Sequence, residues 1–346
     1  MNILIGENIV YKLKEYLKAK KVNRLYIITD ENVSRLYIYG LKDIVKDFSI
    51  NIYTLKPGEE SKSMATILSI YDDLIKNNVD RNTIILSFGG GVVGDIAGFV
   101  AATYKRGLKY IQIPTTLLAQ VDSSVGGKVG IDYNGYKNII GSFYFPEMTI
   151  IDLEFLKTLS SREITCGLGE VLKCGLIYDY KFFQSTIDNL DNIYNKRLDI
   201  LLGIIKKSIG IKKEVVSKDR YDIGMRRILN FGHTIGHGIE AYYNFNKYNH
   251  GEAVILGMIY ESYIAYKMGL IDSPYFNEIY HGLKKLMAPV RFNDGEIRNL
   301  IHIMKNDKKN FDDNIVFVLP VLRGKVELCK NVDERLIVES LEGEWI

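Results

Sequence analysis

Short apolar runs alternate with amphipathic stretches over the first 150 residues of the chain. Buried strands are predicted by short, mostly apolar runs at residues 24–29, 50–55, 83–88 and 110–113. Residues 63–77 instead carry apolar side chains at helical spacing and predict an amphipathic helix. Strands that alternate with helices are typical of a parallel sheet with both faces covered. We therefore expect residues 1–154 to form an α/β domain.

Long helical stripes replace this alternation from about residue 155. Apolar side chains recur at helical spacing over residues 198–216 and 253–268. A later apolar run at 315–320, followed by a second at 326–328, predicts a small hairpin. Because single hydrophobic cores rarely extend over 346 residues, we expect two domains. The second, mainly helical domain is predicted to span residues 155–346.

The composition is that of an ordinary globular protein. Hydrophobic residues make up 47% and charged residues 25%, and the net charge of +3 gives no reason to expect binding to nucleic acid or to an anionic membrane. The three cysteines form no C-x-x-C pair, which favours free thiols in a reducing compartment. The N-terminal residues lack a signal-peptide pattern, and no window of about 18 uncharged apolar residues predicts a membrane span. We therefore expect a soluble, cytoplasmic protein.

A glycine-rich turn follows the predicted strand at residues 83–88. Gly89, Gly91 and Gly94 satisfy G-x-G-x-x-G, and the bare backbone N–H groups of such a turn can approach a pyrophosphate. The acidic residue that normally follows about 20 residues later is absent, since residues 113–116 read Ile-Pro-Thr-Thr. The turn is therefore not the standard dinucleotide fingerprint. A nucleotide site and a tight turn without a ligand remain two interpretations of these residues.

Polar residues also follow two other predicted strands. Asp30 closes the first strand and is a candidate to contact a ribose or a base, and Glu59 and Lys62 follow the second strand. Open α/β sheets collect ligands at this edge. The alternative interpretation is that these charges are simply solvated.

Three of the five histidines, His233, His237 and His250, fall within 18 residues. Neutral imidazole is the commonest metal ligand in proteins. His233 and His237 share one face of a helix, so spacing alone favours them as a ligand pair. The alternative is that these histidines cap helices or fill small polar holes. Their density among glycines favours a metal site.

Several cations lie in glycine-rich or helical context. Gly126-Gly-Lys128 resembles a phosphate loop, but the spacing of a P-loop is absent. Other candidates for anion binding are Lys137 beside Asn138, Lys173 three residues after Glu170, and Lys212, Arg226 and Asn230. Taken singly, most lysines are solvated surface groups. Together with a metal and a glycine turn, this set favours a phosphorylated, polyhydroxylated substrate.

Seven motifs match one known family in order and spacing. They are Gly89-Gly-Gly-Val-Val-Gly-Asp95, Thr103-Tyr-Lys-Arg-Gly107, Pro114-Thr-Thr-Leu-Leu-Ala119, Val121-Asp-Ser-Ser-Val-Gly-Gly-Lys128, Gly169-Glu-Val-Leu-Lys173, Leu229-Asn-Phe-Gly-His-Thr-Ile-Gly-His237 and His250-Gly-Glu252. With these motifs the chain resembles the 3-dehydroquinate synthase family, the sugar phosphate cyclases of the shikimate route. The resemblance runs from Asp30 to the segment Asp307–Lys309.

The resemblance implies a fold and a reaction. The fold is an NAD-binding α/β domain with a parallel sheet and a non-standard Rossmann-like site, followed by a helical metal-binding domain, in a homodimer. The reaction converts 3-deoxy-D-arabino-heptulosonate 7-phosphate to 3-dehydroquinate and phosphate. It passes through transient oxidation by NAD, phosphate elimination, re-reduction, ring opening and aldol cyclisation. The chain would then be a carbon–oxygen lyase of chorismate and aromatic amino acid biosynthesis.

The same resemblance implies the roles of individual residues. Zinc or cobalt would be bound by Glu170, His233 and His250. NAD would be contacted by Asp30, Glu59, Lys62, Gly91, Val92, Val93, Gly94, Asp95, Thr115, Thr116, Lys128, Lys137, Phe155 and Thr158. The substrate and its reacting groups would be contacted by Asp122, Lys128, Asn138, Lys173, Lys212, Arg226, Asn230 and His237, and by Arg106 from across the dimer interface. His237 is thereby assigned to the phosphate instead of the metal.

Some positions depart from the family pattern, and rival functions exist. Asp219-Arg220 stands where an Asp-Glu pair is usual, and Asp222 stands where Glu is common. The family's Gly-Lys-Asn reads Tyr136-Lys-Asn138 here, with the glycine one position earlier, at Gly135. A related cyclase that makes an inosose or a valiolone-type ring is the nearest rival. An NAD-dependent polyol dehydrogenase is a second, although its metal-binding acid is usually Asp, whereas this chain has Glu170. A metal- or nucleotide-binding module without catalysis is a third.

Overall fold

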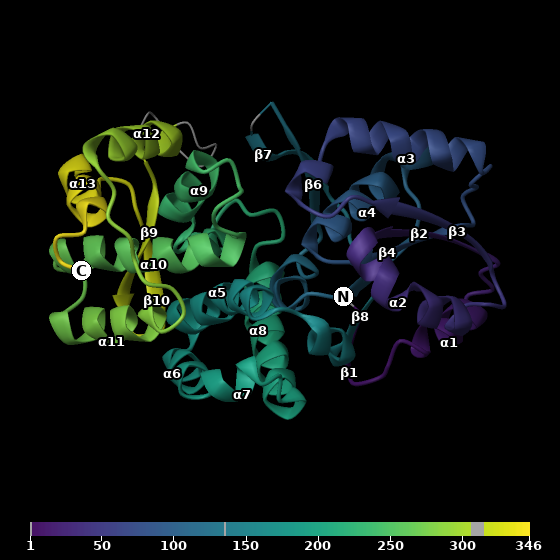
Figure 1. Cartoon of the computed structure of the whole chain (residues 1–346), viewed down its shortest axis with the longest axis horizontal. Coiled ribbons are helices and arrows are strands. Elements are labelled where there is room, and N and C mark those ends of the chain that lie inside the picture. The colour runs from purple at the N-terminus through teal and green to yellow at the C-terminus, as the bar shows by residue number, and fades with distance from the viewer. Residues whose placement is uncertain (1, 135, 306–314) are drawn as a thin grey trace. The chain divides into compact units, whose positions relative to one another are not determined.

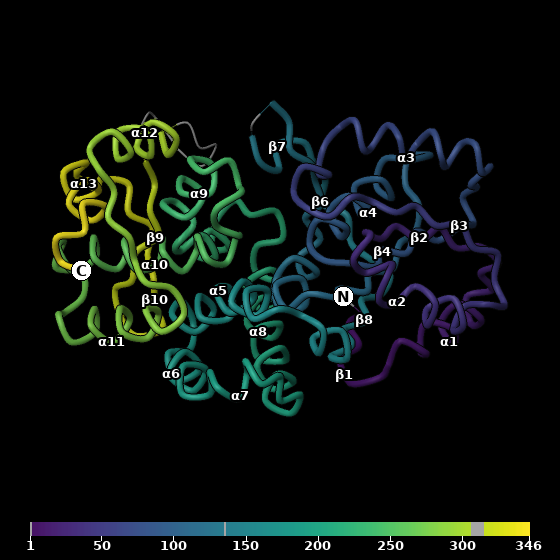
Figure 2. Tube along the Cα trace, in the orientation of Figure 1, coloured from purple at the N-terminus to yellow at the C-terminus, as the bar shows by residue number. Residues whose placement is uncertain are grey.

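The structure is a computed structural model that describes residues 2–134, 136–305 and 315–346 (Figures 1 and 2). Gly135 and the segment Asp307–Lys309, which belong to the family resemblance described above, lie outside the described residues. The chain divides into two compact units. The first contains Met1–Ser160 and Lys196–Ile209, and the second contains Ser161–Asn195 and Gly210–Ile346.

The first unit is built on a six-stranded sheet with the order β1-β8-β5-β4-β2-β3. Every neighbouring pair of strands is parallel. The strands are β1 (Ile3–Gly6), β2 (Arg24–Asp30), β3 (Ser49–Leu55), β4 (Ile84–Gly89), β5 (Tyr110–Pro114) and β8 (Met148–Asp152). The predicted parallel α/β domain is confirmed.

Helices cover both faces of this sheet, and β2 shows why. Its alternate residues Leu25 and Ile27 pack in one apolar cluster, while Tyr26 and Ile28 pack in another. Helices α1 (Lys12–Ala19) and α2 (Glu31–Ile44) contribute to the first cluster. Helices α3 (Met64–Lys76) and α4 (Gly91–Thr103) contribute to the second. The unit also contains the antiparallel hairpin β6 (Lys128–Tyr133) and β7 (Tyr136–Phe143), and the short turns η1 (Glu59–Ser61), η2 (Tyr104–Arg106), η3 (Ala119–Ser123) and η4 (Leu153–Thr158).

The second unit is mainly helical, as predicted. Its helical elements are α5 (Ser161–Tyr178), α6 (Tyr180–Asp188), α7 (Leu190–Tyr194), η5 (Met225–Asn230), α9 (His233–Tyr242), α10 (His250–Lys267), α11 (Ser273–Lys284), α12 (Asp294–Lys305) and α13 (Glu334–Glu342). Helix α8 (Leu198–Lys218) has residues in both units. The predicted late hairpin forms from β9 (Phe317–Leu322) and β10 (Lys325–Cys329), which are antiparallel.

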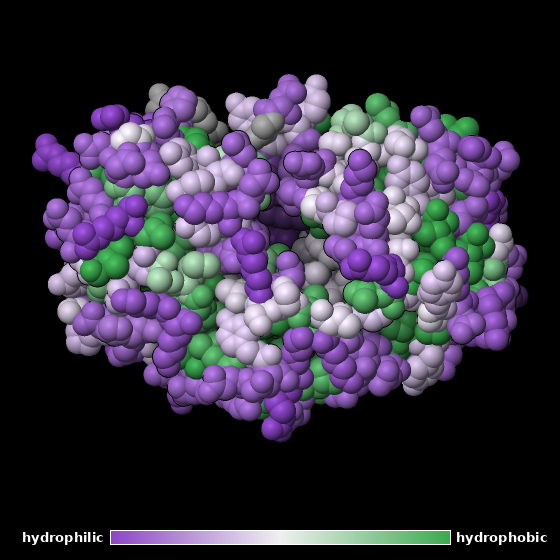
Figure 3. Space-filling view, viewed as in Figure 1, coloured by the Kyte–Doolittle hydropathy of each residue, from purple (hydrophilic) through white to green (hydrophobic). Residues whose placement is uncertain are grey.

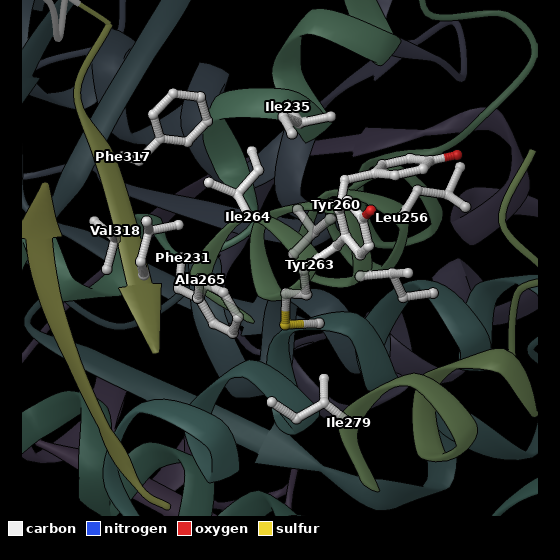
Figure 4. Close-up of a cluster of buried hydrophobic side chains, with 14 of the residues drawn as sticks. Phe231, Ile235, Leu256, Tyr260, Tyr263, Ile264, Ala265, Ile279, Phe317 and Val318 are labelled. Carbon is white, nitrogen blue, oxygen red and sulfur yellow. The ribbon is translucent and has the colours of Figure 1, made fainter. Parts of the chain in front are cut away.

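Helix α10 lies at the centre of the second unit. Every residue from Gly251 to Ala265 is buried, so apolar side chains surround the helix on all sides (Figure 4). Ile264 and Tyr263 of α10 lie in one cluster with Phe231, Ile235 and the β9 residues Phe317 and Val318. The beginning of α10, which carries His250, is therefore anchored to a rigid core.

The outer surface differs in character from these cores. On the face drawn in Figure 3, hydrophobic residues lie in small groups between hydrophilic ones. None of the helices in the described part of the chain combines the length and the apolar character needed to cross a membrane.

Candidate metal centre and glycine turn

Glu170, His233 and His250 come together in the second unit from three different helices. Glu170 lies in the middle of α5, and His233 and His250 are the first residues of α9 and α10. Glu170 Oε1 is 3.4 Å from His233 Nε2 and 3.3 Å from His250 Nε2. The three potential ligand atoms all lie within 4.8 Å of one another. One carboxylate and two imidazoles are a donor set that zinc and cobalt accept.

Both histidine rings are held at Nδ1, which leaves Nε2 directed at Glu170. His233 Nδ1 is 3.1 Å from the carbonyl oxygen of Phe231, and His250 Nδ1 is 3.2 Å from Glu240 Oε2. Because both partners are acceptors, each Nδ1 donates a proton to its partner, and Nε2 is the nitrogen left for a metal. Metal-binding histidines are commonly fixed in this way.

Glycines allow the three helices to approach closely enough to bring the ligands together. A Cβ placed on Gly251 of α10 would lie 1.9 Å from the carbonyl oxygen of Cys166 on α5. A Cβ on Gly257 of α10 would lie 1.9 Å from the carbonyl oxygen of Gly232, which precedes α9. Backbone therefore packs directly on backbone at both contacts, and only glycine fits there.

The charges around Glu170 favour its ionised form. Its side chain is 1% exposed and forms an ion pair with the buried Lys173 on the same helix. Burial opposes ionisation, but the Lys173 ammonium and the two imidazoles outweigh it and hold the pKa of Glu170 well below its usual value. Both oxygens of Glu170 are buried without a hydrogen bond of regular geometry. A buried, ionised carboxylate that faces two imidazole Nε2 atoms fits a divalent cation.

The pKa values of the two imidazoles are shifted in opposite directions. Burial and the nearby Lys173 ammonium lower the pKa of His233 well below its usual value, so this ring is neutral. Burial also disfavours the charged form of His250, but the carboxylates of Glu240 and Glu170 raise its pKa to about 9.

The other predicted residues of this unit lie on the same helices or on neighbouring elements. Lys173 follows Glu170 on α5, and His237 follows His233 on α9, with its ring centroid 5.0 Å from that of His233. Lys212 of α8 and Arg226 of η5 are 5% and 3% exposed, and Asn230 ends η5. Lys212 and Arg226 are thus two buried cations in the same unit as the metal cluster, which suits an anionic ligand.

The pair suggested by spacing alone, His233 and His237, does not form a ligand set. Among the described residues, the candidate ligand groups are Glu170, His233 and His250, and an overlapping group of His237, Glu240 and His250. Within the part of the chain that the structure describes, no such group contains both His233 and His237. Four-residue spacing places the two rings on one helix face, but the donor atoms that converge with His233 come from α5 and α10.

The region that departs from the family pattern is organised by Asp219. Its carboxylate accepts hydrogen bonds from the backbone N–H groups of Ile223, Gly224 and Arg226. Arg226 Nη1 donates to the carbonyl oxygen of Arg220. The backbone of Arg220 therefore contacts the side chain of Arg226 in this arrangement.

The glycine turn of the first unit joins β4 to α4. Gly89 ends β4, Gly90 caps α4, and Gly91, Val92, Val93, Gly94 and Asp95 form the first turns of the helix. A Cβ on Gly94 would lie 2.6 Å from Gln112 Nε2, so the end of the Gln112 side chain would have to shift to admit a larger residue. The turn therefore presents a helix N-terminus, which favours anionic groups, at the carboxyl edge of the sheet.

Several predicted NAD contacts gather at this edge. Asp30 ends β2 and caps α2, and Thr115 and Thr116 follow β5. Lys62 Nζ is 2.7 Å from Asp95 Oδ2 and 3.7 Å from Glu59 Oε1, and Lys137 Nζ is 3.6 Å from the same Glu59 oxygen. Phe155 and Thr158 lie in η4, where both contact Tyr37, the phenylalanine through its ring and the threonine through its hydroxyl. Lys62, Asp95, Glu59 and Lys137 thus form one network of charges at the glycine turn. Phe155 and Thr158 form a separate group around Tyr37.

The remaining predicted residues of the first unit lie in the turns η2 and η3 and in the hairpin β6–β7. Asp122 belongs to the π-helical turn η3, a geometry often found at functional sites. Lys128 begins β6. Asn138, in β7, and Arg106, in η2, have left-handed backbone conformations with φ of 51° and 64°.

Two carboxylates near the metal cluster were not predicted from the sequence. Glu240 contacts His250, as described above, and lies seven residues after His233 on α9, so helical spacing could have signalled it. Glu261 of α10 is fully buried and accepts hydrogen bonds from the N–H groups of Gly232, Thr234 and Ile235 at the start of α9. No sequence pattern signals that second contact, because the partners are about 27 residues away.

Comparisons with known proteins agree with this architecture. Residues 52–166 match the family description "3-dehydroquinate synthase N-terminal", and residues 167–310 match "3-dehydroquinate synthase C-terminal". The 3-dehydroquinate synthase of Alkaliphilus metalliredigens is 42% identical over 325 residues, which cover 94% of this chain and 91% of that protein. The 3-dehydroquinate synthase of Streptococcus pyogenes serotype M6 is 39% identical and covers 99% of this chain, with 96% of its own length matched.

Solved structures of related cyclases share the whole fold. The 2-epi-5-epi-valiolone synthase of Streptomyces hygroscopicus, described with NAD+ and Zn2+ bound, has a TM-score of 0.89 at 25% identity, covering 98% of this chain and 95% of that one. A 2-deoxy-scyllo-inosose synthase, complexed with carbaglucose-6-phosphate, NAD+ and Co2+, has a TM-score of 0.89 at 28% identity, covering 98% and 96%. Matches along the full length, in sequence and in structure, show that the chain belongs to the 3-dehydroquinate synthase family.

Proposed function

We propose that this protein catalyses the reaction of its family, the conversion of 3-deoxy-D-arabino-heptulosonate 7-phosphate to 3-dehydroquinate and phosphate in the shikimate pathway. The observation that carries the proposal is the convergence of Glu170, His233 and His250 beside the buried Lys173. The relatives at about 40% identity bear the name of this activity, which makes it the first choice among the cyclases.

We propose one divalent metal, zinc or cobalt, and NAD as cofactors. Glu170, His233 and His250 would hold the metal and leave positions open for substrate oxygens. When bound, the metal polarises a substrate hydroxyl and NAD accepts and returns the hydride. The backbone N–H groups at Gly91–Asp95 would hold the pyrophosphate of NAD, with Thr115 and Thr116 beside them.

The cationic side chains would bind the anionic substrate. The buried Lys212 and Arg226, with Lys173, suit the carboxylate and the hydroxyl groups of the heptulosonate. Lys128, Asn138 and His237 are assigned to the phosphate, where they would stabilise charge on the leaving group. Asp122 and Asn230 would orient substrate hydroxyl groups by hydrogen bonds.

We also propose a homodimer in which Arg106 reaches the phosphate of the neighbouring subunit. Arg106 ends η2 and has a left-handed backbone conformation. The test is subunit complementation. Mixing an Arg106→Ala subunit with a Glu170→Ala subunit should restore part of the activity, and no recovery in proven mixed dimers would contradict the proposal. The cytoplasmic location stays a prediction from the sequence.

Substrate discrimination tests the proposed function. The protein, reconstituted with NAD and zinc, should release phosphate from the heptulosonate phosphate at a much higher rate than from a hexose or heptulose phosphate without a carboxylate. Lys212→Met should reduce this preference, because one of the cations proposed to bind the carboxylate is removed. Preference for a substrate without a carboxylate would favour a related cyclase, the second candidate suggested by the shared fold with the valiolone and inosose synthases. Continuous NADH formation from a polyol would identify a dehydrogenase instead.

A further inference from the structure

We infer that Glu240 is a positioning residue of the metal centre, which holds the His250 ring with Nε2 directed at Glu170. This inference rests on the metal site of the proposed function. Glu240 lies on α9 and is 2% exposed, and its Oε2 is 3.2 Å from His250 Nδ1. A carboxylate behind a metal-binding imidazole fixes the tautomer and the orientation of the ring and increases its basicity.

The two histidines differ in how much support they need. The side chain of His233 is 10% exposed, and its Nδ1 contacts the carbonyl oxygen of Phe231, only two residues away. The side chain of His250 is 27% exposed and stands at the first position of α10. Packing alone therefore restrains His250 less than His233. The contact from Glu240 on a second helix provides the missing restraint.

Glu240 also belongs to the overlapping cluster with His237 and His250, so it could be a ligand itself. The geometry of His250 argues against this role. One ring nitrogen faces Glu170 at 3.3 Å and the other faces Glu240 at 3.2 Å, so a metal beside Glu240 would replace the hydrogen bond that orients the ring. The Glu170 cluster is also the more buried, and its carboxylate oxygens lack regular hydrogen bonds. We therefore place the metal at Glu170 and the proton between His250 and Glu240.

The experiment compares metal affinity in Glu240→Gln and in the wild type, without substrate. The amide keeps the shape and one acceptor oxygen but removes the charge. Affinity for zinc and cobalt should fall by about 10- to 100-fold, the usual effect of losing a partner behind a metal-binding histidine. The visible spectrum of the cobalt-saturated variant should match the wild type, because the three ligands are unchanged. Glu240→Ala should weaken binding at least as much.

Glu339→Gln is a matched control. Glu339 also accepts a hydrogen bond from a side chain of α10, Tyr263, at 2.6 Å. Tyr263 lies 13 residues after His250, or about 20 Å along the helix at 1.5 Å per residue. Metal affinity should be unchanged in this control, while thermal unfolding of the metal-free proteins monitors general damage.

Two results would overturn the inference. Wild-type metal affinity in both Glu240→Gln and Glu240→Ala would show that the contact does not position His250. A cobalt spectrum with an altered coordination number at saturation would make Glu240 a ligand. If Glu240→Gln does not fold, Glu240→Asp retains the charge but withdraws it by one methylene, and unchanged affinity there would equally contradict the inference. Failure of the wild-type holoenzyme to release phosphate would reject the proposed function and leave the affinity comparison intact.

Discussion

Substituting Gly251 by Ala should disrupt the metal centre without touching any ligand. The new Cβ would lie 1.9 Å from the carbonyl oxygen of Cys166, whereas real Cβ atoms essentially never approach closer than 3.0 Å. Helices α5 and α10 would have to separate locally by about 1 Å. Because Glu170 and His250 stand on these two helices, their separation would grow as well. Metal–ligand distances tolerate about 0.2 Å, so metal affinity should fall by more than about tenfold.

The cost in stability follows from the same contact. Overpacking typically costs about 1–3 kcal/mol, and replacing glycine by alanine in a helix regains about 1 kcal/mol. The clash involves backbone, which cannot rotate away, so we expect an overpacking cost near the upper end of that range, about 3 kcal/mol. Subtracting the gain of about 1 kcal/mol leaves a net loss of about 2 kcal/mol. Zinc titration and thermal unfolding of the metal-free protein would measure the two effects separately.

Gly210→Ala on α8 is the control for this substitution. A Cβ at Gly210 meets nothing within 4 Å, so the same chemical change should stabilise the protein by up to about 1 kcal/mol and leave metal affinity unchanged. Wild-type zinc affinity and stability in Gly251→Ala would refute the argument that glycine packing brings the ligands together.

Three further predictions concern the same unit. His237→Ala should lose most turnover and keep its metal, because His237 is assigned to the phosphate; metal loss measured by elemental analysis would contradict that assignment. Glu261→Gln should lower the midpoint of thermal unfolding and cost about 1–3 kcal/mol of stability, because an amide cannot accept hydrogen bonds from all three N–H groups at the start of α9. An unchanged unfolding midpoint would refute the capping role of Glu261. Removal of the metal by a chelator should also lower the midpoint of thermal unfolding, since a ligand at 100 times its Kd stabilises the folded state by about 2.7 kcal/mol. Identical unfolding midpoints of the metal-free and metal-bound proteins would argue against a metal site that forms only in the folded state.

The apolar runs predicted four strands of the sheet, β2, β3, β4 and β5, but β1 (Ile3–Gly6) and β8 (Met148–Asp152) were not predicted. The run at 110–113 corresponds to β5 (Tyr110–Pro114), and the helix expected at 63–77 is α3 (Met64–Lys76). The hairpin β6–β7 was not predicted, because β7 is largely exposed and carries no apolar run or clear alternation. The return of residues 196–209 to the first unit also has no local signal, since α8 is continuous through it.

The site was less accessible to sequence reasoning than the fold. Helical spacing suggested His233 with His237, but the converging donors come from helices far apart in the sequence. Only the family resemblance brought Glu170 and His250 to the metal. The contacts at Gly251 and Gly257 depend on how helices cross, which periodicity does not encode. Glu261 likewise acts on the backbone of another helix, so its role becomes visible only in the fold.

The central claim is that NAD is used and regenerated within one turnover while phosphate leaves the substrate. Zinc-loaded protein should therefore be incubated with an excess of the heptulosonate phosphate and less NAD than substrate, and phosphate and NADH should be followed together. The account predicts that phosphate release exceeds the NAD supplied many times over and that no NADH accumulates. Release that stops at one phosphate per NAD, with an equal amount of NADH formed, would contradict it.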